Sequence, residues 1–64
     1  MIDSNYKKLI INCIYAIIKN NKTITDDEIN LKLKEFGFNI DSFSKGAIDG
    51  IRAGFEYIDR VKRI

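Results

Sequence analysis

The run "LIINCIYAII" over residues 9–18 limits the possible folds of this chain more than any other segment. At about 100° per residue, one side of a helix collects Tyr6, Leu9, Ile10, Cys13, Ile14 and Ile17. Ile11 and Ile18 widen this apolar side, so the pattern predicts a helix over residues 4–20 that is buried on more than one side. Isoleucine also favours strands, but the run lacks the strict alternation of a half-buried strand.

The same run is short for a membrane segment. A helix that crosses a bilayer needs about 20 apolar residues, whereas this run stops at Ile18 and contains Asn12. The segment that follows, "KNNK", also lacks the small residues of a signal-peptide cleavage site. We therefore expect a core helix in a cytoplasmic protein without a membrane segment.

A chain of 64 residues allows one domain, and a domain of this size has little stability to spare. Cys13 is the only cysteine, which excludes a disulfide within the chain, and the sequence contains no histidine. One thiol cannot build a zinc site, so we expect no metal and no cofactor, with Cys13 as a buried structural residue. Stability then has to come from a well-packed helical core or from a second subunit.

A second helix is expected over residues 26–36. Thr25 and Glu28 have the spacing of a capping box, and acidic residues occupy the first turn. Gly37 then provides a C-terminal cap, with Phe38 placed to pack back on the last turn. Ile29, Leu33 and Phe36 form the predicted inward stripe, while Leu31 points away from it.

The third helix is expected over residues 42–63, with Asp41 as its preferred N-cap. Its core stripe follows from helical spacing and consists of Ile48, Ile51, Phe55 and Ile58. Charged residues occupy the opposite side, where pairs such as Arg52 and Glu56 are four residues apart. The sequence thus predicts an all-α fold of three helices with a long C-terminal helix.

Three glycines lie inside this third helix at a spacing of four residues: Gly46, Gly50 and Gly54. Each costs roughly 0.5–1 kcal/mol of helix stability relative to alanine. The spacing places them in one continuous groove, which either packs against the first helix or contacts another subunit; the remaining interpretation is a kinked or frayed helix. We expect a homodimer whose interface consists of Gly46, Gly50, Gly54, Tyr57, Val61, Ile11 and Ile18.

Composition points away from catalysis. The carboxylates occupy polar faces or helix caps, and no histidine is available to activate Cys13. We expect a non-enzymatic module that binds a protein and occupies or blocks it, with Tyr15, Leu31 and Phe43 as contact residues. The Ile-, Asn- and Lys-rich composition and the small size are typical of an accessory inhibitor from a phage or plasmid of an AT-rich genome.

A helix-turn-helix regulator is the alternative. The third helix would then enter the DNA major groove, with Ser42, Ser44, Lys45 and Arg52 facing bases and phosphates. The charge pattern disfavours this hypothesis, because the net charge is only +2 and acidic residues are interspersed along that helix.

Overall fold

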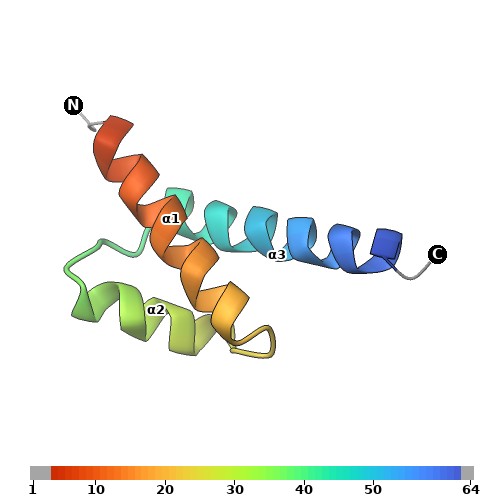
Figure 1. Ribbon diagram of the computed structural model, residues 1–64. Helices are drawn as coiled ribbons and strands as arrows, with labels where there is room; N and C mark the ends of the chain where they lie inside the picture. The colour runs from red at the N-terminus through yellow and green to blue at the C-terminus, as the bar shows by residue number, and fades with distance from the viewer. Residues whose placement is uncertain (1–3, 63–64) are drawn as a thin grey trace.

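The computed structural model describes residues 4–62 and contains three α-helices in this part of the chain (Figure 1). They are α1 (Ser4–Asn20), α2 (Asp26–Glu35) and α3 (Ser42–Lys62). The predicted all-α, three-helix fold is confirmed, and the expected end of the third helix at residue 63 lies outside the described residues. α1 crosses the other two helices and packs against both, which makes it the central element. Among the described helices, none combines the length and the apolar character needed to cross a bilayer.

The hydrophobic core lies where α1 meets its two neighbours. Its buried side chains come from all three helices and from the α1–α2 loop: Ile10, Ile14, Ile18, Ile24, Ile29, Leu33 and Ile48. In α1 and α2, two residues expected to point inward are exposed instead, Leu9 by 59% and Phe36 by 65%. The buried row of α1 consists of Ile10, Ile14 and Ile18, which are four residues apart. With this row facing the core, Leu9 points toward solvent. Phe36 is the C-cap of α2, and the half-buried Phe38 packs on the core in its place.

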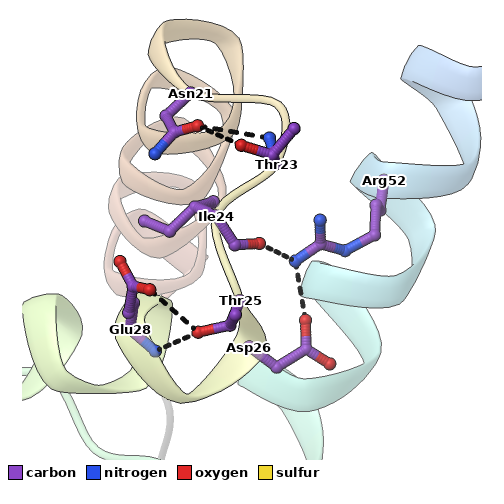
Figure 2. Close-up of polar contacts among 7 residues, drawn as sticks. All are labelled: Asn21, Thr23, Ile24, Thr25, Asp26, Glu28 and Arg52. Carbon is purple, nitrogen blue, oxygen red and sulfur yellow. Dashed lines mark hydrogen bonds and ion pairs between the residues drawn. The ribbon is translucent and has the colours of Figure 1, made fainter.

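The ends of α2 are fixed by local hydrogen bonds at the predicted cap residues, but the Glu28 side chain meets the Thr25 hydroxyl and not the Thr25 backbone N–H that a full capping box uses. The Glu28 backbone N–H donates to Thr25 Oγ1 at 3.2 Å, and the Thr25 hydroxyl donates to Glu28 Oε1 at 3.3 Å (Figure 2). At the other end, Gly37 has φ of 89°, a left-handed conformation that glycine adopts without strain. Its N–H donates to the Lys34 carbonyl at 3.0 Å and that of Phe38 to the Leu33 carbonyl at 2.9 Å, which together form a Schellman motif.

The connection from α2 to α3 is tied to α1 and then caps α3. The Asn39 N–H donates to the Tyr6 hydroxyl at 3.0 Å, and the Tyr6 and Phe38 rings meet edge to face. Asp41 caps α3 as predicted, because its Oδ1 accepts from the Ser44 N–H at 3.0 Å. Ser44 Oγ accepts from the Asp41 N–H at 2.9 Å, so the two residues form a reciprocal capping box.

The molecule is elongated because α3 extends well past the other two helices (Figure 1). The extents are 44 × 22 × 17 Å and the radius of gyration is 12.3 Å. A compact domain of this length has a radius of gyration of about 10.7 Å. Along the predicted core stripe of α3, Ile48 is buried, Ile51 and Phe55 are half-buried, and Ile58 is 48% exposed. The C-terminal half of α3 therefore keeps apolar side chains that the rest of residues 4–62 does not cover.

Candidate protein-binding face

One side of α3 is apolar and uncovered, and we call it the glycine face. It consists of Phe43, Gly46, Ala47, Gly50, Gly54, Tyr57, Ile58 and Val61, and it borders the side of α3 that packs on α1. A Cβ atom added at Gly46, Gly50 or Gly54 would meet no neighbouring atom within 4 Å. Close packing inside the monomer, one of the three interpretations left open by the sequence, therefore does not account for these glycines.

Two shallow hollows lie along the glycine face, and α1 forms one wall of each. The first, of about 460 Å³, has Gly46 and Gly50 in its lining and Ile11 of α1 at its edge. The second, of about 170 Å³, lies next to Gly54 and is bounded by Tyr15 of α1. Because glycines lack side chains, both hollows expose helix backbone that a bulky neighbouring side chain can contact.

The α1 side of the glycine face is fixed by an aromatic pair. Tyr15 and Phe55 stack with ring centroids 5.2 Å apart and an interplanar angle of 26°. The Lys22 ammonium lies 5.7 Å from the Phe55 centroid and forms an ion pair with Asp59 at 3.2 Å. Contacts of this kind hold the middle of α3 in place where few apolar side chains are buried.

A second set of polar contacts fixes α3 on the side away from the glycine face. Arg52 Nη2 donates to Asp26 Oδ1 at 2.7 Å and to the Ile24 carbonyl at 3.0 Å (Figure 2). In the loop before α2, Asn21 Oδ1 accepts from the N–H and the hydroxyl of Thr23. Arg52 thus joins α3 to the start of α2. The sequence had instead predicted that Arg52 pairs with Glu56 on its own helix.

The residues predicted for a dimer interface are brought together with one exception. Gly46, Gly50, Gly54, Tyr57 and Val61 are exposed on the glycine face, and Ile11 lies at its edge. Ile18 is only 1% exposed, so the expectation that it lies on an outer surface is wrong. It occupies the same buried row of α1 as Ile10 and Ile14.

The residues predicted to bind a partner protein divide between two regions. Tyr15 is 48% exposed at the rim of the second hollow, and Phe43 is half-buried beside the first. Both therefore border the glycine face. Leu31 is exposed on α2 and lines neither hollow.

The residues of the DNA-binding alternative do not form a cationic surface. Ser44 is fully buried as a capping residue, so its predicted exposure is wrong. Arg52 is half-buried and paired with Asp26. Ser42 and Lys45 are exposed, but they line a hollow of about 450 Å³ together with Asp26, Asp27 and Asp41. Three carboxylates beside one ammonium repel a phosphate backbone.

Sequence reasoning missed that Ala47, Ile51 and Ile58 belong to the walls of the two hollows, because Ile51 and Ile58 had been assigned to the core. A signal was present, since the apolar arc of α3 covers roughly 200° of the helix, more than one neighbour can bury.

In α1, burial raises the pKa of the half-buried Cys13 thiol. Within residues 4–62, no group of His, Cys, Asp and Glu side chains is arranged to hold a metal ion.

Comparison of the chain with protein-family models, with curated proteins and with solved structures finds no match.

Proposed function

We propose that this protein is a non-enzymatic binding module that packs its glycine face against a helix of a protein partner. The observation that carries the proposal is the continuous apolar surface over Gly46, Gly50 and Gly54, which nothing in the described chain covers. Contiguous apolar patches on a small protein are typical of interaction sites. By binding there, the module would occupy or block the partner surface that it contacts.

The glycines support a helical partner in particular. Each costs roughly 0.5–1 kcal/mol of helix stability relative to alanine, and no packing contact within the described residues offsets that cost. A helix that packs on small residues spaced by four can bring its backbone close and gain dispersion contacts along the groove. Tyr15 and Tyr57, exposed at the two margins, are the aromatic anchors of the proposed contact.

The non-enzymatic part of the proposal has its own support. Because burial raises the pKa of Cys13, the thiol stays protonated at neutral pH, where a nucleophilic cysteine needs a lowered pKa. Asp26 is bound to Arg52, and Asp41 is used as a helix cap, so both carboxylates have structural roles.

A capture experiment with a matched control tests this function. Tagged wild-type protein, Gly50→Leu and Glu56→Leu are used to capture partners from a lysate of a low-GC bacterium, with and without nuclease. Gly50→Leu fills the first hollow, whereas Glu56→Leu adds the same side chain to the charged side of the same helix. Circular dichroism confirms that each variant is helical.

We expect wild type and Glu56→Leu to retain the same protein after nuclease treatment, and Gly50→Leu to lose it. Equal retention by all three proteins would contradict the assignment of the glycine face. Capture that disappears with nuclease would favour the DNA-binding alternative.

A further inference from the structure

Building on the proposed binding role of the glycine face, we infer that its occupant is the same face of a second copy of this chain. The two α3 helices pack antiparallel around a two-fold axis at Gly54. Such an interface is isologous, so each contact from one copy to the other occurs twice.

The accessible surface area of the chain is consistent with a second copy as the occupant. Its accessible surface is 4955 Å². A compact monomer of 64 residues exposes roughly 4,200 Å², so the excess is roughly 750 Å². A standard protein interface buries about 800 Å² per partner. This excess arises from the elongated shape of the chain as a whole, and it is of the same order as the area that one side of a standard interface buries.

The shape of the glycine face is self-complementary only in the antiparallel direction. Between Phe43 at its N-terminal end and Gly54, the glycine face is small, with Gly46, Ala47 and Gly50, and its C-terminal half is bulky, with Tyr57, Ile58 and Val61. An antiparallel pair centred on Gly54 sets Ile58 of each copy opposite Gly50 of the other, and Val61 opposite Ala47. A parallel pair would set bulky side chains against one another and leave the glycine hollows empty.

Charge selects the register of the pair. Asp49 and Arg60 are both exposed and border the glycine face on its polar side. With the axis at Gly54, Asp49 of each copy lies one residue, about 1.5 Å along the helix axis, from the level of Arg60 of the other, which is close enough for two ion pairs. If the axis lay midway between Gly50 and Gly54, Asp49 would instead lie one residue from the level of Glu56, a repulsive arrangement.

The test is the solution mass of the full chain, measured by sedimentation equilibrium from micromolar to millimolar concentration. We expect a reversible monomer–dimer equilibrium in wild type. Asp49→Arg alone and Arg60→Asp alone should each raise the dimer Kd by roughly tenfold, because two attractive pairs become repulsive. The two single variants mixed together should form a heterodimer, and the double exchange in one chain should restore the homodimer. Both residues are exposed, so these variants keep the monomer fold.

Three results would overturn the inference, and they bear differently on the proposed function. A monomer at every concentration that still captures a protein through Gly50 excludes self-pairing and leaves the binding function standing. A monomer that captures a protein equally well with and without the Gly50→Leu change would rule out both the self-pairing and the proposed binding function of the glycine face. A dimer unaffected by the charge exchange and by Gly50→Leu places its interface elsewhere. Formation of the mixed heterodimer supports the antiparallel register directly.

Discussion

Replacing Gly46, Gly50 and Gly54 together by alanine should have opposite effects on the monomer and on its association. In the monomer, each added Cβ enters open space, so no steric cost offsets the better helix propensity of alanine. The expected gain is roughly 0.5–1 kcal/mol per site, or about 1.5–3 kcal/mol for the triple variant. That is a large fraction of the free energy of unfolding of so small a domain.

Thermal unfolding followed by circular dichroism at low micromolar concentration measures the monomer. For a domain of this size, 1 kcal/mol changes Tm by roughly 4–8 °C, so the triple variant should melt at least about 6 °C higher than wild type. At several hundred micromolar, Tm of wild type should rise further, because self-association stabilises the folded state by mass action. The triple variant should show a smaller rise, since three methyl groups separate the paired backbones.

Two outcomes would refute this reasoning. A triple variant that is less stable than wild type in dilute solution would mean that the glycines contact something within the chain. A variant that is more stable in dilute solution and has an unchanged concentration dependence of Tm would mean that the glycine face is not the self-association surface. Single alanine variants then locate which of the three positions is responsible.

Further substitutions test the fold itself. Ile14→Ala removes a fully buried side chain and should cost about 2–5 kcal/mol in chemical denaturation, whereas Leu9→Ala, a deletion at an exposed position, should cost less than about 0.5 kcal/mol. Gly37→Ala should destabilise by about 1–2 kcal/mol, because alanine is strained at φ of 89° although the site has free space; a neutral result would contradict the left-handed cap. A double-mutant cycle on Arg52 and Asp26, each changed to alanine, should give a coupling of about 0.5–1 kcal/mol that falls with added salt, and zero coupling would rule out the ion pair.

The helix caps could be predicted from sequence because each depends on a few adjacent residues. Thr25 with Glu28 closes the start of α2, Gly37 ends it, and Asp41 starts α3. In each case the orphan backbone groups of a helix end are satisfied within about four residues, so no tertiary information is needed. The role of Ser44 was overlooked although it is equally local, since a serine three residues after an aspartate cap can complete the capping box.

The direction in which each helix faces could not be predicted in the same way. Leu9 and Ile18 are both apolar residues of α1, yet one is exposed and the other buried. Their difference depends on the angle at which α1 crosses its neighbours, which a single-helix pattern does not contain. Phe36 has helical spacing to Leu33, but it is the exposed C-cap of α2, and Phe38, which follows the turn at Gly37, packs on the core instead. The sequence placed the glycine stripe on the third helix, but it did not define where the exposed surface of that helix ends and the core begins.

Why α3 leaves its glycines uncovered follows from the contacts on its other sides. A helix with an apolar arc of roughly 200° could rotate to bury the glycines and expose its isoleucines instead. Arg52 and Asp59 oppose that rotation, because the first is bound to Asp26 and to the Ile24 carbonyl and the second to Lys22. Each ion pair alone contributes little, but both lie on the same side of α3 and act together with the burial of Ile48. The same contacts that position α3 in the monomer therefore keep the glycine face directed toward solvent, where a second copy can reach it.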